Sequence, residues 1–361
     1  MLDQRVYSQH FTRPSFGSFE NYVFSLSTEM RSFSVLGSSV LHDFSYDRQD
    51  YFIRVSRWNE MALNRTRLEK DITANGKKHF NLVIDDSAQR RFTSTQFYSA
   101  KNYIGNLGKI DTCTSCVYSL FTDGSNPIPV DFEVYLPRAY QGTRILFTEY
   151  RSKIDLAISL ILRGYYVAKE LGVDIAHVLF DTWYAATRLL NTLNIGGVHY
   201  LTEIRPNRCV KLDKRKLRAQ DLVTVLNSEP VTVYHKGKQY QLTAVFGSLH
   251  EADHMVKIFI VNGNFSGKKQ RRYIVTNDLT MNKEEAIMLL CMRWDIDYFF
   301  REAKTYLCLA DSKFQKLRCF KRHIYLCFVA WSYVRWIIRS ADKKKIRTVF
   351  AAVRWIRKCA A

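Results

Sequence analysis

The stretch KHFNLVIDDS, residues 78–87, contains a short apolar run, Phe80–Ile84, that is followed at once by two aspartates. An apolar run of this length predicts a buried β-strand. We therefore expect Asp85 and Asp86 to lie at the carboxyl end of a strand inside a sheet. Position alone indicates a catalytic site only weakly, because aspartates often follow strands as turn residues or helix caps.

The same pattern recurs around this stretch. AHVLFDTWY, residues 176–184, predicts a second buried strand that ends at Asp181, and HYLTEI, residues 199–204, predicts a third. CTSCVYSLFTDGSNPIPVDFEVYLP, residues 113–137, has the pattern of a hairpin with a long loop. Helical patterns are expected over Lys153–Leu171 and Ala185–Leu193. This order of elements is typical of an α/β core with a mixed sheet.

The flanking regions differ from the core. Short strands separated by turn signals predict a β-rich insertion, and helical periodicity is expected before the core and after the insertion. We divide the chain into a helical N-terminal DNA-binding region (1–75), the first part of the core (76–205), the β-strand insertion (206–282), the helical second part of the core (283–340) and a basic helical tail (341–361).

The charge of the chain favours a polyanionic partner. Its 54 Lys and Arg residues outnumber its 34 Asp and Glu residues, for a formal net charge of +20. Such a field attracts nucleic acid first and an anionic membrane surface second. The apolar run near Ile324–Val334 is shorter than the ~20 residues that a bilayer requires, so we expect a cytoplasmic protein without a membrane partner.

Two further motifs, one of arginines and one of cysteines, each allow a functional and a structural interpretation. Arg54, Arg57, Arg65 and Arg67 indicate either a helical module that binds DNA ends or an ordinary solvated face of a structural helix. Cys113 and Cys116 form one C-x-x-C motif with no second pair nearby, which favours a structural pair over a zinc site.

A third acidic position lies in MRWDIDYFFREAK, residues 292–304, which has a helical pattern. At ~3.6 residues per turn, one stripe contains Arg293, Asp297, either Phe300 or Arg301, and Lys304, whereas Glu302 is rotated ~140° from Asp297. Carboxylates that project from strand ends and from a facing helix can hold two Mg²⁺ ions for phosphodiester chemistry. The alternative is a solvent-facing row of ion pairs that contributes little to stability.

Several blocks, in this order and spacing, resemble bacterial insertion-sequence transposases of the IS4 superfamily, most of all its IS701 branch. The matching blocks include LVIDDS, YIGNLGKIDTCTSCVYS, VDFEVYLP, HVLFDTWY, VTNDLTMNKEEAIMLL, RWDIDYFFREAK and FKRHIYLCFVAW, and they cover about Tyr46–Trp336. The resemblance implies an RNase H-like core with a β-strand insertion before the last catalytic residue. It also implies Mg²⁺-dependent DNA cutting and strand transfer at the ends of a mobile element, with Mn²⁺ able to substitute.

The resemblance also implies site residues. The first catalytic aspartate of the family corresponds to Asp85, with Asp86 its neighbour, and the second corresponds to Asp181. The third is a glutamate in a signature of Tyr, two residues, Arg, three residues, Glu, six residues and Lys. At those positions this chain has Leu290, Arg293, Asp297 and Lys304, so the tyrosine and the glutamate are replaced. Either a site of three aspartates works here, or the chain is a decayed copy that still folds.

The expected roles follow from this correspondence. Asp85, Asp181 and Asp297 are the catalytic residues and metal ligands, and positively charged residues bind the DNA: Arg293, Lys304, Arg301, Arg90 and Arg91. Asp86, Glu302 and His323 are additional candidates, and for His323 a structural or phosphate-contacting role is favoured over metal ligation. The expected partners are the terminal repeats of the element, target DNA and a second copy of the chain, at the nucleoid. The alternatives are an inert relic that binds DNA and a nuclease without strand transfer.

Overall fold

The computed structural model describes residues 4–28, 33–91, 98–105, 108–136, 150–213, 215–226, 228–265, 267–341 and 346–360. The chain opens with a group of helices, as expected: η1 (Gln4–His10), α1 (Arg13–Thr28), α2 (Val35–His42), α3 (Tyr46–Arg54) and α4 (Glu60–Asn75). Local sequence sets the limits of α4. The Asn59 side chain accepts hydrogen bonds from the backbone N–H groups of Met61 and Ala62, both at 3.0 Å, and the helix ends at Gly76, whose φ of 74° suits glycine.

The strands of the described residues form one large mixed sheet in the order β2-β3-β1-β5-β6-β12-β11-β10-β7-β8, with β4 paired to β3 and β9 paired to β10. The strands are β1 (His79–Arg90), β2 (Ala100–Ile104), β3 (Lys109–Thr122), β4 (Ile128–Tyr135), β5 (Asp174–Phe180), β6 (Tyr200–Ile204), β7 (Cys209–Leu212), β8 (Arg215–Arg218), β9 (Val231–His235), β10 (Lys238–Leu249), β11 (Met255–Phe265) and β12 (Lys268–Thr276).

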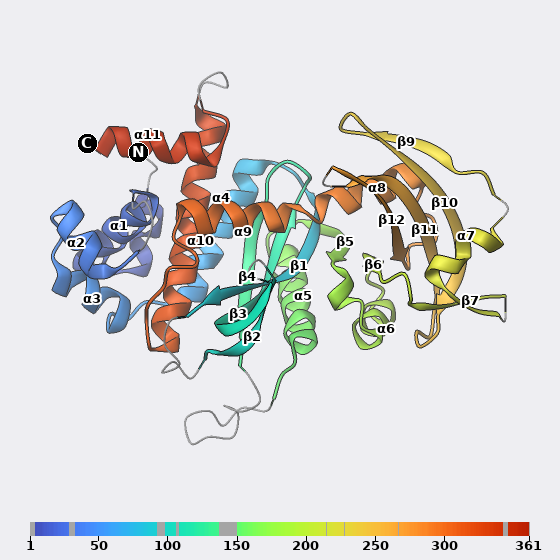
Figure 1. Ribbon diagram of the computed structural model, residues 1–361. Coiled ribbons are helices and arrows are strands. Elements are labelled where there is room, and N and C mark those ends of the chain that lie inside the picture. Colours follow the sequence, from blue (N-terminus) through green and yellow to red (C-terminus); the bar gives the residue numbers. More distant parts are fainter. Residues whose placement is uncertain are drawn as a thin grey trace.

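The remaining helices are α5 (Lys153–Glu170), the short η4 (Thr182–Tyr184), α6 (Thr187–Ile195), η5 (Ala219–Asp221), α7 (Leu222–Val225), α8 (Lys283–Met292), α9 (Asp295–Tyr306), α10 (Leu317–Ser340) and α11 (Val349–Ala360). Of these helices, α5 packs against the core sheet, whereas α11 lies beside the N-terminal helices (Figure 1). The N-terminal helices pack against α10 and α11 at one end of the molecule, and the insertion strands lie at the other end.

The expected fold class is confirmed. In the core, β4 and β3 are antiparallel neighbours, β3 runs antiparallel to β1, and β1, β5 and β6 are parallel, which is the strand order of an RNase H-like core. The β-rich insertion is also present, and it continues the core sheet, because β12 pairs with β6 from Tyr273↔Ile204 to Thr276↔Leu201. The five segments proposed from the sequence remain an interpretation.

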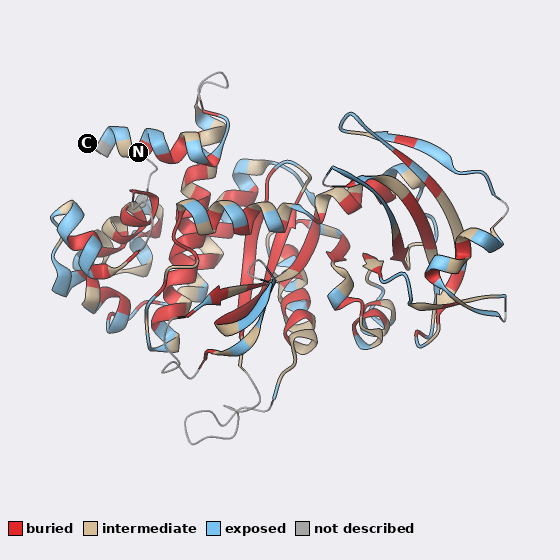
Figure 2. Ribbon diagram, in the orientation of Figure 1, coloured by how far each residue is buried: buried red, intermediate tan, exposed pale blue. Residues whose placement is uncertain are grey.

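Two apolar cores lie on opposite faces of the sheet. Val83 of β1 belongs to the core that includes residues of α9 and α10, whereas Leu82 and Ile84 belong to the core that includes residues of α5. The alternation follows from the pleat, which turns successive side chains of a strand to opposite faces. Buried residues accordingly run along the core strands and α10, whereas much of β9 is exposed (Figure 2).

One expectation about the first strand was wrong. β1 does not end at the aspartates but continues through them to Arg90, because the long strand β3 pairs with it from Asn81↔Thr122 to Arg90↔Cys113. The parallel pairing with β5 does stop there, at Ile84↔Phe180. Asp85 therefore lies where its neighbouring strand ends, although its own strand continues.

The helix expected over residues 292–304 is also interrupted. α8 ends at Met292 and α9 begins at Asp295, so Arg293 and Trp294 form a turn between two helices. Within the described residues, no helix combines the length and the apolar character needed to cross a bilayer.

Candidate active site

Three carboxylates from separate parts of the chain line one cleft of about 470 Å³: Asp85, Asp181 and Asp297. Asp85 lies on β1, Asp181 directly follows β5, and Asp297 lies in the first turn of α9. Arg293 lines the same cleft. The structure thus brings together residues that are more than 200 positions apart.

Asp85 faces the helices α9 and α10, because it lies two residues after Val83 on the same face of β1. One carboxylate oxygen, Oδ1, accepts a hydrogen bond of 2.7 Å from the backbone N–H of Asp86. Desolvation raises the pKa of Asp85 well above its usual value, and the negative charges of Asp181, Asp86 and Asp297 raise it further. Carboxylates therefore lie close together around Asp85, and four arginines line the same cleft: Arg205, Arg271, Arg272 and Arg293.

Asp181 is fixed by the short helix that follows it. Its Oδ1 accepts hydrogen bonds from the backbone N–H groups of Trp183, at 2.9 Å, and Tyr184, at 3.3 Å, as an N-cap does. Desolvation raises the pKa of Asp181, and the positive charge of Arg293 opposes that shift. Asp181 therefore caps the short helix, which was the alternative role considered from the sequence, and it also lines the cleft.

Asp297 lies one helical turn beyond Arg293. Their nearest charged atoms, Nη1 and Oδ2, are 4.0 Å apart, and 51% of the Asp297 side chain is exposed. Desolvation of the enclosed part raises the pKa of Asp297, and Arg293 lowers it. The distance between the two atoms is at the limit of an ion pair, so Asp297 keeps its carboxylate available to the cleft.

Asp86 has a different environment from its neighbour. It faces α5, where its Oδ2 lies 2.6 Å from Lys153 Nζ, and its Oδ1 accepts a 3.2 Å hydrogen bond from the Tyr184 hydroxyl. Asp86 does not line the cleft that contains Asp85. Of the two neighbouring aspartates, the geometry therefore favours Asp85 as the functional one.

The other charged residues of α9 separate into two groups. Lys304 reaches back to the core strand, where its Nζ donates a 3.3 Å hydrogen bond to the carbonyl of Ala88, and desolvation lowers its pKa. Arg301 is exposed and pairs with Glu302 at 3.1 Å. Neither Arg301 nor Glu302 lines the carboxylate cleft. The position of Glu302 agrees with the predicted rotation away from Asp297, whereas Arg301 does not share the cleft with Asp297 as its predicted place on the same stripe would require.

Arg91 needs a correction. Only 7% of this residue is exposed, its Nε donates to Thr114 at 3.0 Å, and one of its terminal nitrogens donates to Gln89 at 3.1 Å. Its guanidinium also lies over the Phe320 ring. These contacts make Arg91 part of the packing between β1 and α10, so it is not a surface group for DNA. Arg90 is about half exposed and pairs with Asp111 at 2.8 Å.

His323 is structural. It is fully buried, its Nδ1 lies 3.0 Å from the Tyr22 hydroxyl, and its Nε2 lies 2.9 Å from the carbonyl of Cys308. Nε2 must donate to the carbonyl, so Nδ1 accepts from the hydroxyl. Desolvation lowers the pKa of His323 to about 4. The predicted structural role is supported, and burial excludes contact with a phosphate in this structure.

The arginines of the N-terminal helices and the C-x-x-C motif were the two motifs with open interpretations. Arg67 is fully buried and pairs with Asp71 at 2.8 Å, so it is not part of a solvated basic face, and Arg65 pairs with Glu170 at 2.9 Å. Cys116 is buried, and burial raises the pKa of its thiol to about 12. The C-x-x-C motif therefore behaves as a structural pair.

Several residues of the cleft were missed from the sequence, among them the charged residues Glu203, Arg205, Arg271 and Arg272 and the aromatic Trp294. Glu203 Oε1 lies 2.7 Å from Arg272 and 3.7 Å from Arg293, and both guanidinium groups lie over the Trp294 ring. Glu203 could have been found by the rule that singled out Asp181, because it lies at the carboxyl end of the next parallel strand. Arg272 carried no such signal, since its place depends on the pairing of β12 with β6.

The donor chemistry of the cleft fits Mg²⁺. In the described part of the chain, no group of three or more His, Cys, Asp or Glu side chains is placed to hold an ion unaided. Mg²⁺ prefers oxygen ligands, keeps several waters, and is commonly held by one or two carboxylates together with substrate phosphates. Asp85, Asp181 and Asp297 supply oxygen donors, the pKa of Asp85 is raised by the neighbouring carboxylates that a cation would neutralise, and the remaining ligands would come from water and DNA.

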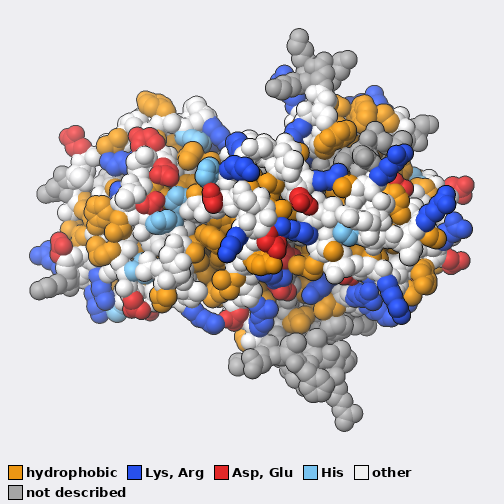
Figure 3. Space-filling view, turned by 180° about the vertical axis from the view of Figure 1, so that it is seen from behind, with side chains coloured by type: hydrophobic (Ala, Val, Ile, Leu, Met, Phe, Trp, Pro, Cys, Tyr) orange, Lys and Arg blue, Asp and Glu red, His pale blue; other side chains and the backbone are white. Residues whose placement is uncertain are grey.

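Positive charge does not gather in a single patch on one face of the molecule. On the face shown in Figure 3, Lys and Arg side chains are widely spread, and acidic side chains lie among them. The net charge of +20 therefore favours DNA binding without outlining the path of a duplex.

Comparisons with known proteins identify the family of the chain. Residues 7–224 match the family described as "DDE superfamily endonuclease", and residues 128–345 match the family described as "Archaeal putative transposase ISC1217". A curated relative, the "Probable transposase for insertion sequence element IS701" of Microchaete diplosiphon, is 28% identical over 170 residues, which are 46% of this chain and 42% of the relative. The chain thus matches less than half of that relative's length.

A solved structure, the NurA nuclease from Sulfolobus solfataricus, is similar over 59% of this chain and 72% of its own, with 9% identity and a TM-score of 0.26.

Proposed function

The chain belongs to the DDE superfamily of endonucleases and transposases, and from that membership we propose that it is the transposase of a mobile insertion sequence. It cuts DNA at the ends of the element and joins those ends to target DNA. The observation that carries the proposal is the cleft in which Asp85, Asp181, Asp297 and Arg293 meet. The proposal also includes a requirement for metal ions, strand transfer, and the assembly of two copies of the chain on DNA at the nucleoid.

Asp85, Asp181 and Asp297 act as the metal ligands of this proposal. They would hold two Mg²⁺ ions, or Mn²⁺ in their place, and such ions would supply activation of an attacking oxygen and charge stabilisation at a leaving oxygen. Asp181 is oriented before metal binds, because two backbone N–H groups hold its Oδ1. Asp85 is oriented by the N–H of Asp86. Both carboxylates therefore present their second oxygen atoms at low conformational cost.

Arg293 is the group best placed to bind the reacting phosphate. It lines the cleft, and its terminal nitrogens lie 3.7 Å from Glu203 and 4.0 Å from Asp297, both longer than a hydrogen bond. The guanidinium therefore keeps donors for a charge-assisted hydrogen bond to a phosphate oxygen. Lys304, Arg301 and Arg90 lie outside this cleft and are proposed to contact the DNA backbone beyond it.

A second candidate function is an inert relic that binds DNA but does not cut it. Two departures from the family signature favour it. Leu290 is buried in the apolar core, so this position offers no hydroxyl to DNA, and Asp297 is one methylene shorter than glutamate. A nuclease that cuts without joining is the third candidate.

One experiment separates the three candidates. Purified protein is incubated with DNA carrying the ends of its element and a target plasmid, with Mg²⁺, Mn²⁺ or EDTA, and nicked and joined products are scored. Nicking and joining support the transposase, nicking alone supports the nuclease, and binding without nicking supports the relic. Asp85→Asn should remove any metal-dependent product.

A further inference from the structure

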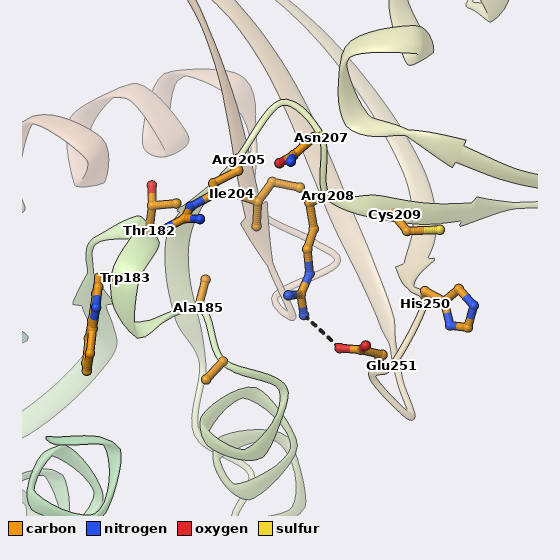
Figure 4. A pocket seen from close by; sticks show the side chains of 11 residues that line it. Thr182, Trp183, Ala185, Ile204, Arg205, Asn207, Arg208, Cys209, His250 and Glu251 are labelled. Carbon is orange, nitrogen blue, oxygen red and sulfur yellow. Dashed lines mark ion pairs between the residues drawn. The ribbon is translucent and has the colours of Figure 1, made fainter. Parts of the chain in front are cut away.

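A second hollow adjoins the carboxylate cleft. It has a volume of about 400 Å³ and shares Thr182, Ile204 and Arg205 with the cleft, so the two form a continuous depression. We call this hollow the basin. In Figure 4, Arg205 extends toward Thr182, on the cleft side, and Arg208 extends toward Glu251 on the opposite side.

Within the basin, the carboxylate of Glu251 lies next to the guanidinium of Arg208. Arg208 Nη2 lies 3.6 Å from Glu251 Oε2 and donates a 3.1 Å hydrogen bond to Thr187 Oγ1. The Thr187 hydroxyl in turn donates to Glu251 Oε2 at 3.1 Å. Thr187 is the first residue of α6, and its N-cap, Ala186, supplies no side-chain cap. The Glu251 carboxylate therefore lies beside a guanidinium and the hydroxyl of the first residue of a helix.

These are the groups that bind a phosphate. Arginine binds phosphate oxygens through charge-assisted hydrogen bonds, and helix N-termini favour anions through their free N–H groups. We propose that the basin binds a backbone phosphate of the DNA strand that leaves the carboxylate cleft, and that Glu251 holds this phosphate position in the unbound protein. The proposal rests on the proposed function, since it takes DNA as the ligand.

The Glu251 side chain can move away from Arg208 at little cost in stability. Its side chain is 68% exposed, and ion pairs of such exposure contribute little to stability. The turn that carries it is held to α6 and β6 by other contacts: Asn191 donates to Asp253 at 3.0 Å, and the Tyr200 hydroxyl lies 2.8 Å from His254 Nε2. The carboxylate can therefore leave the basin while the turn stays in place.

The test compares three charge-neutralising variants of the full chain in binding a short fluorescein-labelled duplex, by anisotropy over a range of salt without metal. Glu251→Gln should tighten binding by roughly twofold to fivefold, the range expected when one exposed ion pair no longer competes. Arg208→Gln should weaken binding and reduce the salt slope by about 0.9, the value for one phosphate contact. In the double variant, Glu251→Gln should no longer tighten binding.

Asp253→Asn is the matched control, because it removes the same charge from the same turn but does not contact Arg208. It should change affinity clearly less than Glu251→Gln. Equal effects of the two variants, or an undiminished effect of Glu251→Gln without Arg208, would show a general charge effect and overturn the proposal. If the wild-type protein binds no duplex, the basin proposal falls with it. If it binds but never cuts DNA, only the proposed transposase activity fails.

Discussion

Asp85 and Asp86 are adjacent in sequence, yet the structure predicts opposite effects when each is replaced by asparagine. Asp86 makes a 2.6 Å charged contact with Lys153, and both side chains are mostly enclosed, with exposed fractions of 23% and 19%. Hydrogen bonds to charged groups contribute about 1.5–3 kcal/mol, and partial exposure reduces this to about 1–2 kcal/mol here. Asp86→Asn should thus lower the melting temperature by roughly 1–3 °C while cleavage continues.

Asp85→Asn should do the reverse. Its carboxylate lies among other negative charges that raise its pKa, so neutralising it costs no ion pair and should leave the metal-free melting temperature unchanged or higher. Cleavage should be lost, because a proposed metal ligand is removed. The assay pairs thermal unfolding in EDTA with nicking in Mg²⁺ or Mn²⁺. Lys153→Gln, which removes the other half of the ion pair, should reproduce the thermal loss of Asp86→Asn.

The reasoning would be refuted if Asp86→Asn abolished nicking without lowering the melting temperature while Asp85→Asn still cut DNA. That result would mean that the face of β1 turned toward α5 carries the chemistry.

Three other predictions follow from the same structure. Asp297→Glu should raise Mg²⁺-dependent cleavage by restoring reach, whereas Glu302→Gln, outside the cleft, should change it little; full activity of Asp297→Ala would contradict this. The affinity for duplex DNA should fall with salt at a slope of about −0.9 per phosphate contact, and a flat dependence would argue against DNA. The pKa of buried His323 is lowered to about 4 from 6.5, so the unfolded state binds its proton first as pH falls. Between pH 6.5 and 4, His323 should cost about 3 kcal/mol of unfolding free energy, a loss that urea titrations of His323→Gln should not show.

Local patterns predicted the elements that carry the site. The apolar runs before Asp85 and Asp181 predicted two buried strands, and parallel pairing of those strands brings the two aspartates to the same edge. The separation of Asp297 from Glu302 followed from helical geometry alone, even though α9 begins only at Asp295.

Features that depend on distant partners could not be predicted in this way. β1 continues past its aspartates because β3 is long enough to pair with it, and no residue near Asp85 signals that length. Arg91 looked like a surface cation, but Thr114 and Phe320 enclose it. The basin likewise depends on a turn of the insertion that meets α6 across 64 residues of sequence.

The central claim is that Asp85 and Asp181 support metal-dependent cutting of DNA. The most direct test compares the wild-type protein with Asp85→Asn and Asp181→Asn on DNA that carries the element ends, in Mg²⁺, Mn²⁺ and EDTA, with binding measured on the same samples. The account predicts nicks only with the wild-type protein and only with metal, and duplex binding by all three proteins. Nicking by either variant at the wild-type rate, or nicking in EDTA, would contradict it.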